Sequence, residues 1–334
     1  MATFPNEQRQ YVQENRGQFS GNTFATYGID LTTEKGLARV SEPSLQAITS
    51  DDDSSYNRYA GAIFEYDGSY IAMSDKAFSS STATGNWNQM TIVGDEPDTS
   101  DFVVDGVVFN GLALISDTTG VKSFDGTSWD NWWGTELGET ALTTGRHLME
   151  VGPDRNLYIV ETVNKLYKVD IDDNVTKTGQ GTLDYSATEY EFSCLESNST
   201  RMWIGTENTE GGEAIIIEWD LSATSTTANR EHRMGAKKVV CIAIWNDTPI
   251  AVLSNGKIKY FNGSSFVDYP RAQFPSSVSD VTLRDDYIHP NGWAIIDNLP
   301  HFLIKGSQHI ADASTVFENS AALWNMPSGV WCLD

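Results

Sequence analysis

The sequence predicts an all-β protein, a β-propeller of about seven four-stranded blades, with six blades as the alternative count. One apolar segment recurs six times, at intervals of 42 to 47 residues. Short strand-like stretches flank each copy, and no helical periodicity separates them. A unit of up to four antiparallel strands within about 45 residues is typical of a propeller blade. A long β-sandwich, or two sandwiches, remains the alternative architecture.

The recurring segment is a short apolar run that a polar turn usually precedes. Because each copy has the same place in its unit, we interpret it as the same strand in successive blades. The copies are YIAMSD from Tyr70, LALISD from Leu112, LYIVET from Leu157, MWIGTE from Met202, PIAVLS from Pro249 and WAIIDN from Trp293.

Further strands are predicted on both sides of the recurring segment. Apolar stretches come before it, as at residues 62–66, 103–109 and 239–245. Alternating or apolar stretches come after it, and Asp-Gly, Asn-Gly or Gly closes most of them, which is a hairpin signal. These later stretches cover residues 121–126, 166–170, 215–220, 258–263 and 302–306.

The two ends of the chain each carry a hairpin signal. Residues 24–31 and 36–40 form the first hairpin, and residues 321–325 and 330–334 form the second. We expect both ends to share a closing blade, because such pairing removes exposed sheet edges. The predicted organisation is therefore an N-terminal arm, residues 1–22, and a single β-propeller domain, residues 23–334.

Composition excludes several classes of function. The chain has 46 acidic and 22 basic residues, a formal net charge of -24. This balance argues against nucleic-acid binding by phosphate neutralisation and against docking on anionic lipid. No apolar run approaches 18 residues, and the first residues lack the apolar core of a secretory leader, so we expect no membrane insertion. The three cysteines predict buried thiols rather than a disulfide framework.

No motif predicts catalysis, a metal or a cofactor. Residues 123–129 contain the ingredients of the Asp-box found in sialidases, but in the wrong register, which favours a plain hairpin turn. Acidic stretches at residues 51–53 and 170–174 could supply calcium ligands, although the second lacks the Gly and Glu of an EF-hand loop. Paired carboxylates carry no information among so many acids. We therefore expect a protein that is not an enzyme.

Aromatic residues supply the two candidate contact sites. Trp129, Trp132 and Trp133 cluster within five residues and could stack on a glycan, or could instead pack between blades. We expect one of Trp132 and Trp133 to point outward, because adjacent strand residues face opposite sides. In the arm, Phe4, Tyr11 and Phe19 are too few for a core but could anchor on a neighbouring protein;.

The terminal hairpins, residues 27–39 and 322–334, resemble those of virion proteins from tailed bacteriophages. The resemblance implies a non-enzymatic structural propeller of the tail, such as a nozzle or tail-tip ring. It would assemble with copies of itself and other tail proteins, and fold in the host cytoplasm before joining the virion. An acidic ring would let DNA pass without binding it. The alternatives are a propeller adhesin for host-surface glycan and a glycan-degrading enzyme on the same scaffold.

Overall fold

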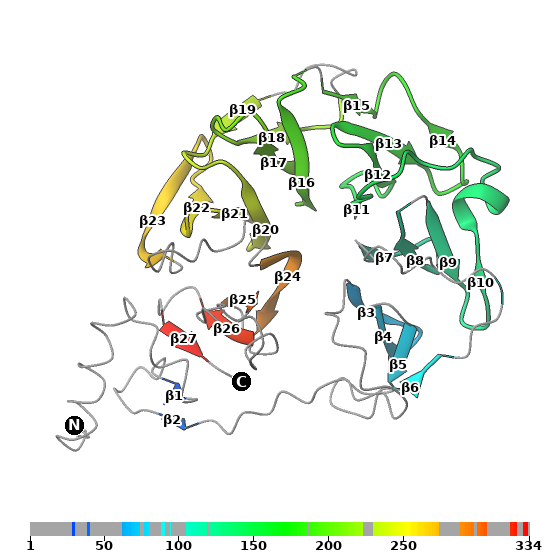
Figure 1. Cartoon of the computed structure of the whole chain (residues 1–334), viewed down its shortest axis with the longest axis horizontal. Helices are drawn as coiled ribbons and strands as arrows, with labels where there is room; N and C mark the ends of the chain where they lie inside the picture. Colours follow the sequence, from blue (N-terminus) through cyan, green and yellow to red (C-terminus); the bar gives the residue numbers. More distant parts are fainter. Residues whose placement is uncertain are drawn as a thin grey trace. The chain divides into compact units, whose positions relative to one another are not determined.

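The computed structural model describes residues 29–30, 39–40, 62–73, 77–80, 88–90, 94, 105–118, 120–185, 187–222, 230–273, 288–296, 299–305, 321–325 and 330–332. These residues form antiparallel strands and one short π-helix, Trp132–Glu136 (Figure 1). The all-β prediction is confirmed, and the fold class is a β-propeller.

Six sheets of four or five strands lie within the described residues, beside one sheet of two strands. Each large sheet has the size of a propeller blade, and its strands follow in chain order. The strands of the first three are β3 (Ala62–Tyr66), β4 (Ser69–Met73), β5 (Ala77–Ser80) and β6 (Asn88–Gln89); β7 (Gly106–Phe109), β8 (Leu112–Ser116), β9 (Val121–Phe124) and β10 (Trp129–Asp130); and β11 (Met149–Val151), β12 (Leu157–Thr162), β13 (Lys165–Val169), β14 (Val175–Thr176) and β15 (Leu183–Asp184).

The remaining three large sheets lie in the second half of the chain. They are β16 (Tyr190–Ser197), β17 (Met202–Asn208), β18 (Ile215–Trp219) and β19 (Arg230–Arg233); β20 (Val239–Trp245), β21 (Thr248–Leu253), β22 (Lys257–Phe261) and β23 (Phe266–Gln273); and β24 (Ile288–Ile296), β25 (Leu299–Lys305), β26 (Ala321–Asn325) and β27 (Val330–Cys332).

Five of the six recurring segments lie on the second strand of their sheet: β4, β8, β12, β17 and β21. The sixth does not, because Trp293 lies on β24, the first strand, and residues 299–305 form the second. The C-terminal hairpin, β26–β27, therefore supplies the last two strands of this sheet. This pairing gives six large sheets in the part of the chain that the structure describes, the lower of the two predicted counts.

The N-terminal hairpin is the two-stranded sheet β1 (Ile29–Asp30) and β2 (Arg39–Val40). β1 lies beside β27, so the two ends of the chain meet as expected. Within the described residues the two hairpins belong to separate hydrogen-bonded sheets, because β1 pairs with β2, whereas β27 pairs with β26. The prediction that both ends share one closing blade is therefore corrected: the ends lie side by side but belong to separate sheets.

The chain divides into two compact units. One contains residues 1–45, 205–216 and 232–334, and the other contains residues 46–204 and 217–231. In the second unit, the first strands of successive sheets lie side by side: β3 contacts β7, β7 contacts β11, and β11 contacts β16 (Figure 1). Side chains that leave these strands can therefore reach the neighbouring sheet.

The hydrophobic core lies between the faces of adjacent sheets. One cluster joins β3–β6 to β7–β10 around Ile71 and Phe124, and a larger one joins β7–β10 to β11–β15 around Trp132 and Leu157. Every residue of β18 is buried, as expected for a strand covered on both faces;. Cys194 and Cys241 are buried thiols, as predicted.

The hairpin turns repeat in detail. The Asp125 carboxylate accepts hydrogen bonds from the main-chain N–H groups of Thr127 and Ser128, at 2.7 and 2.8 Å. In its own turn, Asn262 Oδ1 accepts two equivalent bonds, from the main-chain N–H groups of Ser264 and Ser265, each at 3.0 Å. Gly126 has a φ of 97°, which a residue with a side chain rarely adopts;. The Asp-box ingredients thus form a plain Asx turn, as predicted.

Candidate functional site

The three tryptophans proposed for glycan contact are all buried. Trp129 is 0% exposed, and Trp132 and Trp133 are each 1% exposed. None of the three indoles presents a face on which a sugar could stack in this structure. The expectation that Trp132 or Trp133 points outward is wrong.

The reason is the local backbone. Trp132 and Trp133 begin a π-helix rather than continuing a strand, so the alternation of strand side chains does not apply to them;. Asn131 caps this turn by accepting a hydrogen bond from the main-chain N–H of Gly134. Trp132 meets the ring of Phe109 edge to face, while Trp133 stacks on Tyr167 at a centroid distance of 6.4 Å. The pair therefore fills the space between two sheets, the alternative weighed for it.

The other predicted contacts divide between described and undescribed residues. Phe4, Tyr11 and Phe19, together with the acidic stretch at residues 51–53, lie outside the described residues. In the loop at residues 170–174, Asp170 accepts hydrogen bonds from the main-chain N–H groups of Asp172 and Asn174. These bonds lower the pKa of Asp170, with the Asn174 main-chain bond as the largest cause. The loop is thus built as a tight turn around one carboxylate.

Sequence reasoning missed a second polar region, where the first strands of adjacent sheets meet. Asp105 directly precedes β7 and is 2% exposed. Its Oδ1 accepts a hydrogen bond from the main-chain N–H of Gly106, and its Oδ2 accepts one from Met149 on β11, both at 2.8 Å. The side chain therefore ties one sheet to the next.

Glu150 makes the corresponding link from β11 to β16. Its Oε1 accepts a hydrogen bond from the main-chain N–H of Ser197 at 3.1 Å and lies 2.6 Å from the Ser197 hydroxyl oxygen. Burial, with a smaller contribution from the Asp105 carboxylate, raises the pKa of Glu150 to about 7 against the opposing effect of hydrogen bonds from Ser197. A carboxyl group that titrates near neutrality is also what a general acid requires.

His147 adds a third link in the same unit and is fully buried. Its Nδ1 lies 2.6 Å from the carbonyl oxygen of Val160 on β12, and its Nε2 lies 3.3 Å from that of Thr118. The ring therefore spans from the turn after β8 to the neighbouring sheet. We name Asp105, His147, Glu150 and Ser197 the inter-sheet polar links.

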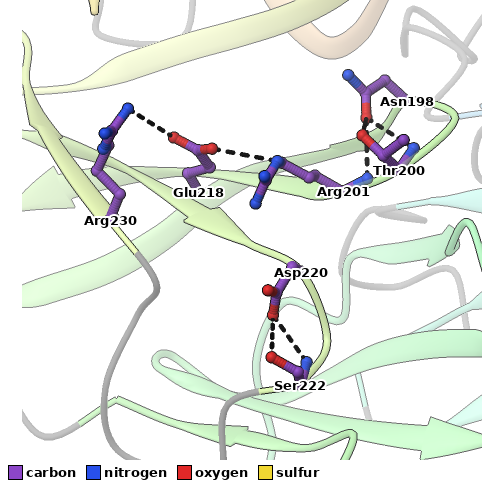
Figure 2. A network of polar contacts seen from close by, with 7 residues as sticks. All are labelled: Asn198, Thr200, Arg201, Glu218, Asp220, Ser222 and Arg230. Carbon is purple, nitrogen blue, oxygen red and sulfur yellow. Dashed lines mark hydrogen bonds and ion pairs between the residues drawn. The ribbon is translucent and has the colours of Figure 1, made fainter. Parts of the chain in front are cut away.

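A separate network crosses the sheet β16–β19 (Figure 2). Glu218 lies on β18 with its side chain 8% exposed, between the more exposed guanidinium groups of Arg201 and Arg230. Its Oε1 is 3.2 Å from Arg201 Nε, and its Oε2 is 3.9 Å from Arg230 Nη1. One buried carboxylate thus holds a cation on each side, which satisfies the charge that the strand buries.

Asn198 orders the turn that leads to Arg201, and Asp220 separately orders the turn after β18 (Figure 2). Asn198 Oδ1 accepts hydrogen bonds from the main-chain N–H groups of Thr200 and Arg201. Asp220 Oδ1 accepts from the N–H of Ser222 at 2.9 Å and from its hydroxyl at 2.5 Å. Asn198 thus fixes the backbone from which Arg201 reaches Glu218.

The inter-sheet polar links connect neighbouring sheets through hydrogen bonds. Each carboxylate oxygen of Asp105 accepts a hydrogen bond from a main-chain N–H, and one oxygen of Glu150, Oε1, contacts both the main-chain N–H and the hydroxyl of Ser197.

Within the described residues, no group of three or more His, Cys, Asp or Glu side chains is placed to hold a metal ion. In the same part of the chain, no helix has the length and apolarity needed to cross a membrane.

Comparison with known proteins supports the fold. No protein-family model and no curated protein sequence matches the chain. The β-propeller domain of Cps50 (Swd1) from Myceliophteria thermophila is similar in structure, with a TM-score of 0.51 and 9% identity over 82% of this chain and 85% of that one. At this identity the likeness shows the β-propeller fold and nothing about activity.

Two further solved structures are similar over much of the chain. The designed protein Ika8 has a TM-score of 0.49 and 10% identity over 81% of this chain and 72% of its own. A chain of the COPII outer coat vertex on membranes has a TM-score of 0.44 and 14% identity over 66% of this chain. The chain spans 62% of that coat protein's length, and 34% of a second COPII coat chain.

Proposed function

We propose that this chain is a non-catalytic structural β-propeller that assembles in several copies into a phage virion, as a component of the tail. One observation carries the non-catalytic part of the proposal. Asp105, His147 and Glu150, the buried or partly buried ionisable groups where first strands meet, contact main-chain or hydroxyl groups of neighbouring sheets. A catalytic carboxylate would instead need to present an oxygen to its substrate.

The charge of the chain supports a place in an assembled particle. A net charge of -24 disfavours adhesion to DNA, which suits a ring through which DNA passes;. The same charge makes isolated copies repel one another at low salt, so assembly would depend on partner proteins or on ionic strength. The resemblance of the terminal hairpins to tail proteins supports the same assignment.

The adhesin alternative loses its main support. It depended on Trp129, Trp132 and Trp133 as a stacking platform, and all three are buried. The enzyme alternative was based on no particular residues, and the carboxyl groups of Asp105 and Glu150, which act on each other electrostatically, are both engaged in links between sheets.

The experiment is mass spectrometry and electron cryo-microscopy of purified particles from the phage that carries this chain. We expect the chain in the tail in a fixed number of copies, with cross-links from its N-terminal arm to a neighbouring protein. Its absence from purified particles, or cross-links confined within one copy, would refute the proposal. Glycan turnover by the purified chain that disappears in Asp105→Asn would favour the enzyme instead.

A further inference from the structure

At the junction of β11 and β16, one hydroxyl oxygen lies within hydrogen-bond distance of two other oxygens, although the hydroxyl has only one proton. The Ser197 hydroxyl oxygen is 2.6 Å from Glu150 Oε1 and 2.8 Å from the main-chain carbonyl oxygen of Val151. Both distances fall in the range of O–H···O hydrogen bonds. A hydroxyl has a single proton to donate, whereas a carbonyl and an ionised carboxylate can only accept.

A neutral Glu150 resolves this conflict. The carboxyl O–H can then donate to the Ser197 hydroxyl oxygen, whose own proton goes to the carbonyl of Val151. Both short approaches then carry a proton. With an ionised Glu150, the Ser197 hydroxyl can serve only one of the two acceptors, and the other close pair has no proton between its oxygens.

The charges around Glu150 favour the same state. The strands packed against β11 are β7, β12 and β16, and none of them contains a lysine, arginine or histidine. Their charged residues are Glu161 on β12, and Glu191 and Glu196 on β16, with Asp105 directly before β7. The cross-strand partner of Glu150 on β12 is Tyr158, whose hydroxyl donates to Asp154. Of these acids, Asp105 is the one whose charge acts on Glu150, so ionisation of Glu150 would place a second negative charge near that carboxylate.

We propose that Glu150 is a neutral carboxylic acid at and below neutral pH, and that its proton closes a clasp between β11 and β16 that loosens in alkaline solution. Burial, the largest influence, raises the pKa of this group from 4.5 to about 7, in agreement with the geometry. A hydrogen bond that Glu150 accepts from Ser197, whether from the hydroxyl or from the main-chain N–H, acts in the opposite direction, and burial together with Asp105 outweighs both;.

The clasp makes the junction of two blades sensitive to pH, a property independent of whether the protein belongs to a virion. The sign follows from proton binding. Between pH 4.5 and about 7, the unfolded chain has lost this proton while the folded chain keeps it, so stability falls as pH rises through that window;. Above the folded pKa the group is ionised in both states, and its contribution no longer changes.

The test compares the full-length protein with Glu150→Gln, whose amide is uncharged at every pH. Denaturant unfolding at pH 5 and at pH 8 gives the folded-to-unfolded ratio of each protein. From pH 5 to pH 8 this ratio should fall more in the wild type than in the variant, by a factor on the order of 10². Glu210→Gln, a change at an exposed loop position, is the matched control and should follow the wild type. Equal pH dependence of wild type and Glu150→Gln overturns the proposal.

Two readouts keep the proposal testable if Glu150→Gln does not fold. Infrared spectra of the wild type should contain the C=O band of a protonated carboxyl at pH 6 that is lost by pH 9, and Ser197→Ala should shift that band. Hydrogen exchange at the Ser197 amide, corrected for intrinsic rate, should speed up above pH 7. A carboxyl band lost below pH 5, or exchange that does not change across pH 7, overturns the clasp.

Discussion

Replacement of Asp105 by alanine tests whether carboxylates fasten neighbouring sheets. The substitution removes both acceptors for the main-chain N–H groups of Gly106 and Met149, each held at 2.8 Å. A hydrogen bond to a charged group contributes about 1.5–3 kcal/mol, and these donors would remain in a site that is 2% exposed;. We therefore expect Asp105→Ala to lower the free energy of unfolding by about 3–4 kcal/mol.

Asp105→Asn separates charge from hydrogen bonding. Its amide keeps one acceptor oxygen, so one of the two N–H groups retains its bond and the other faces an NH₂ group. We expect a loss of about 1–2 kcal/mol, between the wild type and Asp105→Ala. A free energy of unfolding that decreases from wild type to Asp105→Asn to Asp105→Ala would show that the two hydrogen bonds contribute separately.

The assay is urea unfolding followed by tryptophan fluorescence at constant pH and salt. The control is Asp125→Ala, because Asp125 also accepts two main-chain hydrogen bonds, from Thr127 and Ser128, but lies in an exposed turn of one sheet. Water can replace those bonds, so the control should lose no more than about 1 kcal/mol. An Asp105→Ala loss equal to that of the control would refute the inter-sheet role.

Three further substitutions test other parts of the description by the same unfolding assay. Trp132→Ala should cost about 3–5 kcal/mol, because it empties a fully buried site; a loss below about 1 kcal/mol would contradict its core position;. Gly126→Ala should cost about 1–2 kcal/mol through its φ of 97°, and an unchanged stability would contradict that turn;. Glu218→Gln should cost about 1–2 kcal/mol after allowance for the exposure of Arg201 and Arg230, with weaker salt dependence than the wild type; a neutral effect would show that the network adds no stability;.

Local patterns were sufficient for most of the strands. Residues 62–66, 239–245 and 321–325 were predicted with the bounds that β3, β20 and β26 have. Alternation and Asx-Gly turns are properties of a few consecutive residues, so they can be recognised without the fold. The sixth unit was shifted by one strand, because first and second strands of a blade have the same apolar pattern and only their pairing distinguishes them.

The buried tryptophans show that the rule of alternating strand side chains was applied to residues that do not form a strand. Alternation placed Trp132 and Trp133 on opposite faces, and it holds only for strands. A π-helix directs both indoles into the space between two sheets, where Tyr167 and Phe109 pack against them. No residue type in this stretch marks a π-helix, so only the tertiary structure decided it.

The sequence by itself determined an all-β chain of repeated four-stranded units, because strand periodicity and turn chemistry are local. It could not single out Asp105 and Glu150 among 46 acidic residues. Asp105 meets Met149 across 44 residues, and Glu150 meets Ser197 across 47, which is one repeat in each case. Only the packing of successive sheets brings such positions together, and it is this packing that places the half-buried Glu150 near Asp105 and raises the pKa of its carboxyl group to about 7;.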